Sequence, residues 1–178
     1  SVTTGFKSGG FNGRGTTFAT VTPVDEEILQ AYEIGIKTSL FDNRINLNAN
    51  YYRLAYDGIQ LTAVNSDGVF VMTNATGALI QGFEVDVAAQ VTRKLKLHAS
   101  AGTIDGEYRD YDDSNAAYFN GRSMKSSPDL QWNFAGTYVQ PVGNADLVLS
   151  AQARYTDEYY QNQDTSRLIM TRANTEYN

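Results

Sequence analysis

Apolar and polar residues alternate along several segments of this chain with a period of two. Between Arg44 and Tyr51, the apolar residues Ile45, Leu47 and Ala49 alternate with asparagines. This is the period of a β-strand, because successive side chains point to opposite faces of a sheet. The same alternation returns in four later segments, Phe83–Ala89, Leu95–Ala101, Leu130–Tyr138 and Leu147–Tyr155. Repeated strands with one apolar and one polar face predict a barrel whose outside contacts lipid and whose inside contacts water.

The connections between the predicted strands alternate between short and long. Eight strands are predicted: Ser1–Gly9, Leu29–Phe41, Arg44–Thr62, Val69–Gln90, Leu95–Tyr108, Pro128–Gln140, Ala145–Asp157 and Arg167–Tyr177. The short turns are Phe41–Asn43, Val91–Lys94 and Gln140–Asn144, which places Pro141 in a turn. The long polar loops are Gly10–Ile28, Ala63–Gly68, Asp110–Ser127 and Glu158–Ser166. An up-and-down membrane barrel has this asymmetry. One helical turn is also predicted within Val24–Tyr32.

The predicted fold class is therefore all-β, an antiparallel up-and-down transmembrane β-barrel. Eight strands alone would close a barrel that side chains fill, whereas the long loops and polar inner faces indicate an arc of about eight strands from a larger barrel. In such an arc the first and last strands, Ser1–Gly9 and Arg167–Tyr177, are the outer strands, with unpaired edges.

The alternation also predicts which way individual side chains point. One set is expected to face lipid: Leu47, Leu97, Phe134, Leu149 and Ala151. The opposite set is expected to face the lumen: Asn48, Glu84, Lys96, His98, Asn133 and Gln152. Aromatic side chains favour the two membrane interfaces. Tyr32, Trp132 and Tyr155 are expected at the long-loop end, and Tyr138 at the short-turn end.

Composition and charge exclude several classes of function. The chain has 178 residues, no Cys, one His, and a net charge of −6 from 14 Lys and Arg against 20 Asp and Glu. An acidic chain is a poor non-specific nucleic-acid binder. The single His98 lies on a polar strand face without Cys or acidic residues at metal-ligand spacing. Asp110–Asn115 lacks the glycine and distal glutamate of a calcium loop. The residues predict no catalytic site, no metal site and no cofactor.

A series of short blocks resembles TonB-dependent outer-membrane receptors. The run Thr4–Arg14, read as Thr-Gly-Phe-Lys-Ser-Gly-Gly-Phe-Asn-Gly-Arg, is the most similar block. The later blocks follow in the family's order: Glu33–Lys37, Asn46–Tyr52, Tyr56–Gln60, Asn74-Ala75, Gly82–Asp86, Ser127–Asp129 and the turn at Gln140-Pro141. The resemblance covers essentially the whole chain, so residues 1–178 are expected to be part of the receptor's barrel domain.

The resemblance implies a 22-stranded barrel with a plugged lumen. Such receptors import scarce ligands with energy from a TonB-type partner, which binds N-terminal parts of the receptor. The plug domain and the barrel's terminal strands are expected to be absent from this chain. The resemblance favours a ferric siderophore as ligand, with saccharides, cobalamin or other metal complexes as alternatives. A passive porin-type barrel and a soluble all-β binding domain are the alternative functions.

Ligand contacts in such a barrel are expected from the long loops and the upper lumen wall. Arginine and aromatic side chains there suit an anionic or aromatic ligand. The candidate ligand-binding residues are Arg14, Arg109, Tyr118 and Arg122.

Overall fold

The computed structural model describes residues 1–13, 21–64, 70–74, 77–109, 123–161 and 170–178. The regular elements in these ranges are β-strands, and no helix among them is long and apolar enough to cross a membrane. The strands are β1 (Val2–Lys7), β2 (Gly10–Phe11), β3 (Pro23–Val24), β4 (Glu27–Leu40), β5 (Ile45–Asp57), β6 (Gln60–Val64), β7 (Phe70–Asn74), β8 (Gly77–Gln90), β9 (Leu95–Thr103), β10 (Asp105–Arg109), β11 (Leu130–Val142), β12 (Ala145–Thr156), β13 (Tyr159–Tyr160), β14 (Met170–Thr171) and β15 (Asn174–Tyr177).

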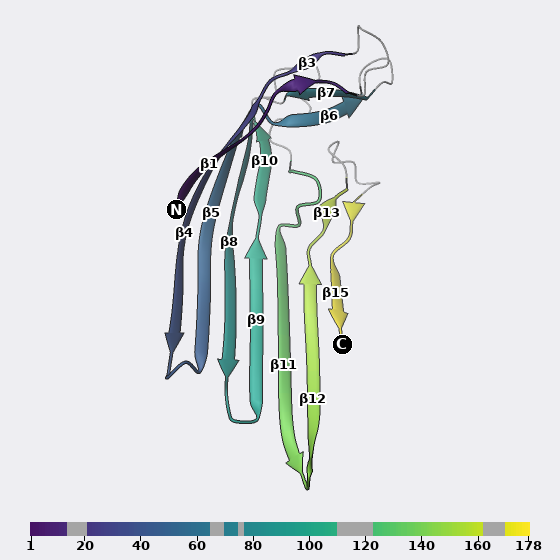
Figure 1. Cartoon of the computed structure of the whole chain (residues 1–178). Coiled ribbons are helices and arrows are strands. Elements are labelled where there is room, and N and C mark those ends of the chain that lie inside the picture. Colours follow the sequence, from purple (N-terminus) through teal and green to yellow (C-terminus); the bar gives the residue numbers. More distant parts are fainter. Residues whose placement is uncertain (14–20, 65–69, 75–76, 110–122, 162–169) are drawn as a thin grey trace. The chain divides into compact units, whose positions relative to one another are not determined.

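The main sheet confirms the predicted order of strands. Among the described residues its hydrogen-bonded order is β1-β4-β5-β8-β9-β11-β12-β15, with β10 paired to β8 (Figure 1). The eight strands of this path correspond one to one to the eight predicted strands. Consecutive strands of the path are neighbours, as in an up-and-down meander. The predicted outer strands are β1 and β15, and both lie at the ends of the path.

The chain divides into two compact units. The first unit comprises Ser1–Tyr32, Arg53–Ile80 and Gly106–Met124, and the second comprises Glu33–Tyr52, Gln81–Asp105 and Lys125–Asn178. The boundary cuts through β4, β5, β8 and β10, so these strands belong partly to each unit.

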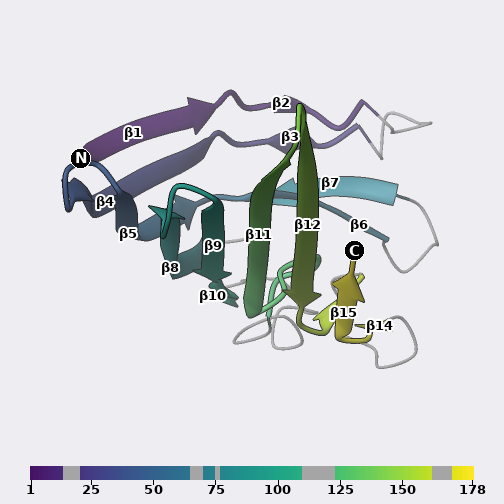
Figure 2. The same cartoon turned by 90° about the horizontal axis from the view of Figure 1, so that it is seen from below.

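In the second unit, long strands pair in a regular antiparallel register. β9, β11 and β12 run side by side in both views (Figures 1 and 2). Opposite residues include Val85 with Ala101, Trp132 with Ala101, and Trp132 with Tyr155. Opposed residues point to the same face of a sheet, so the alternation continues in phase from β8 to β12.

In the first unit, a small core forms around Tyr108. Tyr108 is buried, with only 1% of its surface exposed, and forms a core with Ile59 and Ala78. Three partly buried side chains pack against that core, those of Tyr56, Leu61 and Met124. The strands β6 and β7 form a separate hairpin in this unit, with Gln60 opposite Asn74.

Four predicted strands are interrupted. Predicted Arg44–Thr62 is divided into β5 and β6, Val69–Gln90 into β7 and β8, Leu95–Tyr108 into β9 and β10, and Arg167–Tyr177 into β14 and β15. Three of the divisions are changes of partner, because β6 and β7 pair with each other and β14 pairs with β13, apart from the main sheet. The fourth is not, because β9 and β10 both pair with β8. At the first division Gly58 has φ +65°, a conformation that glycine adopts without steric cost.

The predicted helical turn within Val24–Tyr32 is wrong. Val24 belongs to β3, and β4 begins at Glu27. Residues Glu27 to Tyr32 pair with β1, from Lys7 opposite Glu27 to Val2 opposite Tyr32. This ladder satisfies the backbone groups and overrides the weak local preference for a helix.

The three short turns lie where they were predicted, with one correction. Pro141 lies in β11 opposite Asp146, and the hairpin turn is Gly143-Asn144, with φ +64° at Gly143. The amide of Val139 donates to the carbonyl of Lys94, on the β9 side of β11. The nitrogen of Pro141, two residues on, faces the same side, beyond the first residue of β9. Its missing N–H therefore removes no bond from the ladder.

Candidate functional site

The polar face of the second unit collects the predicted lumen-facing side chains. Lys96 lies opposite both Gln90 and Thr137, and Asn133 lies opposite Ser100. The register places Glu84, Lys96, His98, Asn133 and Gln152 on one face, and Leu97, Phe134, Leu149 and Ala151 on the other. The prediction that these two sets lie on opposite faces is confirmed. We call the polar face the inner wall.

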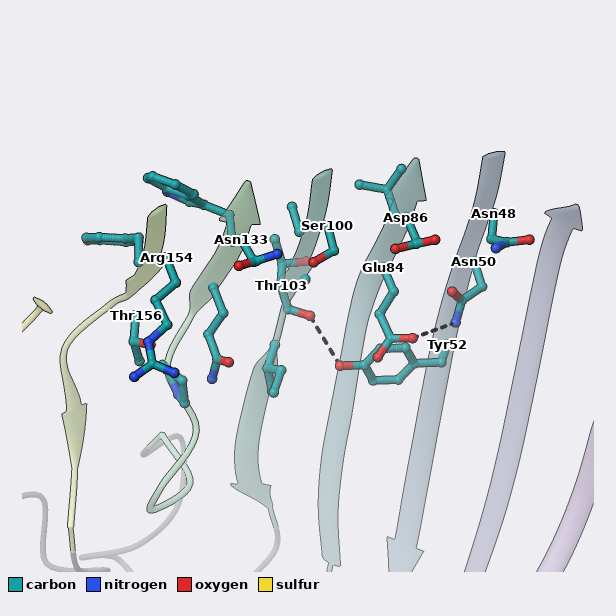
Figure 3. Close-up of a pocket in the computed structure, with 18 of the residues that line it drawn as sticks. Asn48, Asn50, Tyr52, Glu84, Asp86, Ser100, Thr103, Asn133, Arg154 and Thr156 are labelled. Carbon is teal, nitrogen blue, oxygen red and sulfur yellow. Dashed lines mark hydrogen bonds between the residues drawn. The ribbon is translucent and has the colours of Figure 1, made fainter. Parts of the chain in front are cut away.

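A cavity of about 810 Å³ opens along the inner wall near the long-loop end of its strands. Its lining residues include members of β5, β8, β9, β11, β12 and β15, and many of the polar side chains labelled in Figure 3 point to the same side of the sheet. The polar side chains labelled there include Asn48, Asn50 and Tyr52 of β5, Glu84 and Asp86 of β8, Ser100 of β9, Asn133 of β11 and Arg154 of β12. Tyr52 lines the cavity with the asparagines, so the alternation of β5 continues beyond Tyr51.

Hydrogen bonds across strands fix several of these groups. Asn50 Nδ2 donates to Glu84 Oε2 at 3.2 Å, and the Tyr52 hydroxyl donates to the carbonyl of Thr103 at 3.2 Å (Figure 3). The side chain of Tyr52 passes over Gly82, where an added Cβ would collide with the Tyr52 ring and the Thr103 carbonyl. A glycine is therefore required at position 82 for the Tyr52 side chain to reach the Thr103 carbonyl. Gly82 lies in β8, two residues before Glu84.

Carboxylates dominate the charge of this cavity. Arg154 Nε donates to Glu176 Oε2 at 2.7 Å, and Asp86 Oδ2 lies 2.5 Å from His98 Nε2. The partner of the Glu84 carboxylate in its hydrogen bond is the uncharged side-chain amide of Asn50, so this contact does not neutralise the negative charge of Glu84. Amide, hydroxyl and carboxylate groups such as these are hydrogen-bond donors and acceptors.

A second group of polar contacts lies in the first unit. The Asn74 amide donates to the carbonyls of Gly58 at 2.6 Å and Asp25 at 3.0 Å, and its oxygen accepts from the Asp25 N–H at 2.8 Å. Gln60 Nε2 donates to the carbonyls of Asp25 at 2.9 Å and Ser8 at 3.1 Å. The Gln60 N–H donates to Glu27 Oε2 at 2.8 Å. Three of the motif blocks in the sequence thus meet in one hydrogen-bonded network with a structural role.

Of the four predicted ligand-binding residues, the structure places one. Arg109 ends β10, with its Nε 2.6 Å from Glu107 Oε1, so its charge is paired within the same strand. Arg14, Tyr118 and Arg122 lie outside the described residues, as does Asp110–Asn115. A role in ligand binding stays a prediction for all four.

The aromatic side chains of β11 and β12 follow the predicted levels. The rings of Trp132 and Tyr155 stack at a centroid distance of 5.9 Å near the long-loop ends of these strands. Tyr138 lies toward the short turn that joins them. Tyr32 belongs to the first unit, and its level stays a prediction.

The pKa of one carboxyl group just before β11, that of Asp129, is shifted. Burial raises the pKa of Asp129, and the nearby carboxylates of Asp157 and Asp105 raise that pKa further. Asp129 precedes β11, and its backbone carbonyl accepts from the Ile104 N–H at 3.1 Å. In the described part of the chain, no group of three or more acidic or histidine side chains is arranged to hold a metal ion.

The comparison with protein families shows to which family this chain belongs. A family described as "TonB dependent receptor-like, beta-barrel" matches residues 1–175. The chain belongs to this family of TonB-dependent receptors. Its strands are therefore part of the β-barrel of a TonB-dependent receptor-like protein.

Known relatives are similar over most of this chain. A probable TonB-dependent siderophore receptor, PiuA of Acinetobacter baumannii, is 28% identical over 145 residues, which cover 77% of this chain and 18% of that protein. The crystal structure of the same receptor matches with a TM-score of 0.70 at 23% identity, over 86% of this chain and 22% of that one. The ferric yersiniabactin uptake receptor FyuA of Yersinia pestis matches with a TM-score of 0.80 at 16% identity, over 99% of this chain and 25% of that one. The chain thus spans about a quarter or less of these relatives.

Proposed function

We propose that the intact protein carrying this chain is an outer-membrane receptor that takes up a ferric siderophore, with energy from a TonB-type partner. The family match over residues 1–175 is the observation that carries this proposal. A relative named as a siderophore receptor, and structural neighbours named as receptors for ferric yersiniabactin and ferric preacinetobactin, support the ligand class.

In this proposal the chain forms part of the barrel wall. The apolar face, with Phe134, Leu147 and Leu149 exposed by 46%, 50% and 55%, contacts outer-membrane lipid. Exposure of large apolar side chains in a row is unfavourable in water and favourable in hydrocarbon. The inner wall faces the water-filled or plugged lumen, where its amide and carboxylate groups remain hydrated or hydrogen-bonded.

Ligand recognition is assigned to the long-loop end. Arg14, Arg109, Tyr118 and Arg122 are the residues we propose to test there. The cavity beside Glu84 and Asp86 is a poor site for an anionic ligand because three carboxylates, those of Glu84, Asp86 and Glu176, line it against one arginine. We therefore place recognition of an anionic ferric complex in the loops and not on this part of the wall.

Uptake of radiolabelled iron tests the proposal. A strain that lacks the gene should grow more slowly when iron is withheld and should take up less ferric siderophore, and the intact gene should restore both. Removal of the TonB-type partner should give the same defect. Uptake that continues without that partner would indicate a passive barrel instead.

Copper uptake provides a second test of the proposed ligand. One structural neighbour is a copper transporter, OprC, with a TM-score of 0.65. A deletion strain that changes copper uptake and leaves ferric siderophore uptake unaltered would contradict the proposed ligand.

A further inference from the structure

The inner wall has a second cavity at the short-turn end, with the opposite charge to the first. Its volume is about 360 Å³, and we call it the turn-end cavity. The polar side chains that line it include Arg44, Asn46, Gln90, Lys96, His98 and Thr137. None of the described residues that line it is an aspartate or a glutamate.

Small residues on the inner wall create the space. Ala88 of β8 and Ala135 of β11 lie on either side of His98, each directly opposite it in the ladder. Both alanines line the cavity. A methyl group at these two positions leaves a hollow between the longer side chains around it.

Arg44 is held in place by the neighbouring turn. Its Nη2 donates to the carbonyl of Val91 at 2.8 Å, and its Nε donates to the carbonyl of Gln90 at 3.4 Å. The Gln90 N–H also donates to the Arg44 carbonyl at 2.7 Å. A guanidinium has five N–H donors, so these contacts orient the group and leave further donors for a ligand.

Lys96 contributes a second positive charge to the same cavity. Its side chain is exposed, and it has no carboxylate partner among the described residues. Asp86, whose carboxylate is next along the wall, is engaged at 2.5 Å with His98. Two cations that share a cavity repel each other, and an anion between them removes that repulsion.

Neutral donors complete the site. The Asn46 Oδ1 accepts from the Ser39 hydroxyl at 2.7 Å, which leaves the Asn46 NH₂ group as a donor. Oxygen anions are bound in proteins by this combination of guanidinium, ammonium and amide N–H groups.

We propose that the turn-end cavity binds an anionic oxygen group, a carboxylate or a phosphate, between Lys96 and Arg44. Lys96 supplies the main charged contact to the anion. Arg44, whose guanidinium is held in place by the carbonyls of Gln90 and Val91, supplies the second. This site is separate from ligand recognition by the loops. The inference does not depend on the proposed uptake function, because anion binding is measured directly at equilibrium.

Inorganic phosphate binding to the intact, detergent-purified protein tests the proposal. Calorimetric titration should show binding that Lys96→Gln weakens about tenfold or more, the effect of losing one charge-assisted hydrogen bond. Lys125→Gln makes the same charge change at an exposed position outside the cavity, and it should leave binding unaltered. Malonate should compete with phosphate.

A second variant tests the cavity without changing any charge. Ala135→Leu places a larger side chain where the hollow lies and should weaken phosphate binding while Lys96 and Arg44 remain. Phosphate binding that Lys96→Gln and Ala135→Leu both leave unchanged, or that Lys125→Gln weakens equally, would overturn the proposal. Absence of measurable phosphate and malonate binding by the wild-type protein would also overturn it.

Discussion

The orientation of β12 in the membrane can be tested with one pair of neighbouring substitutions. Leu149 lies on the apolar face opposite Tyr138, and Ser150 lies on the inner wall opposite Thr137. The two residues are one step apart along the strand, so they lie at nearly the same depth. Leu149→Arg and Ser150→Arg therefore introduce the same charge at one depth on opposite faces.

The expected cost follows from the position of Leu149 in the strand. Leu149 is four residues from Ala145, where β12 begins. Four steps of about 3.3 Å give about 13 Å along the strand. At a tilt of about 40°, that distance is about 10 Å of height in an apolar band about 25 Å tall. Leu149 is thus close to the bilayer midplane, where an arginine costs about 2–4 kcal/mol.

The assay is reversible unfolding of the intact protein in lipid vesicles, followed by the urea dependence of heat-modifiable migration. Leu149→Arg should lower the free energy of unfolding by about 2–4 kcal/mol, and Ser150→Arg by less than about 1 kcal/mol. The Ser150 hydroxyl lies 3.4 Å from the Thr137 hydroxyl, a long contact whose removal costs little. Equal effects of the two substitutions, or a larger effect at Ser150, would show that the faces are assigned wrongly.

Three further predictions concern groups outside this pair. Gly82→Ala should lower the free energy of unfolding by about 1–3 kcal/mol through overpacking under the Tyr52 ring, while Gly5→Ala, which has open space around it, should have little effect in the same urea titration. Asn74→Ala removes three hydrogen bonds and should cost about 1–3 kcal/mol, with hydrogen exchange and proteolysis increased first in the β6–β7 hairpin. Because the native pKa of Asp129 is raised above its ordinary value of 3.8, its stabilising contribution is present at lower pH and is lost as the pH rises through the native pKa. Asp129→Asn should therefore gain stability over wild type as the pH rises, and a difference between the two proteins that does not vary with pH would contradict the shift.

The alternation in the sequence was sufficient to predict the faces of the long strands. Five segments from Arg44 to Tyr155 alternate strongly, and a one-residue shift in register would turn every side chain of a strand to the other face. The same reasoning could not find where a strand changes partner. The clean alternation of this segment ends after Tyr51, at Tyr52-Arg-Leu-Ala-Tyr56, but that does not locate the division between β5 and β6, which falls at Gly58-Ile59.

The polar network of the first unit was beyond reach of the sequence for a different reason. Asn74 contacts Asp25, which is 49 residues earlier, and Gln60 contacts Ser8, which is 52 residues earlier. No local pattern identifies such partners, although the motif blocks that contain them were visible. Arg109 was selected as a loop residue with an available charge, and the strand β10 instead pairs it with Glu107.

Charge on the inner wall is sorted along the strands, and the strand register maintains this arrangement. Glu84 and Asp86 line one cavity, Lys96 and Arg44 line the other, and the contact between His98 and Asp86 lies where the two meet. A shift of one residue between β8 and β9 would turn the polar set of one strand toward lipid and its apolar set toward the lumen. Ionised side chains near the midplane cost about 2–4 kcal/mol each, so the shifted register is strongly disfavoured in a membrane. In the proposed membrane setting, the lipid that selects the outer face therefore also fixes the positions of the charges on the inner one.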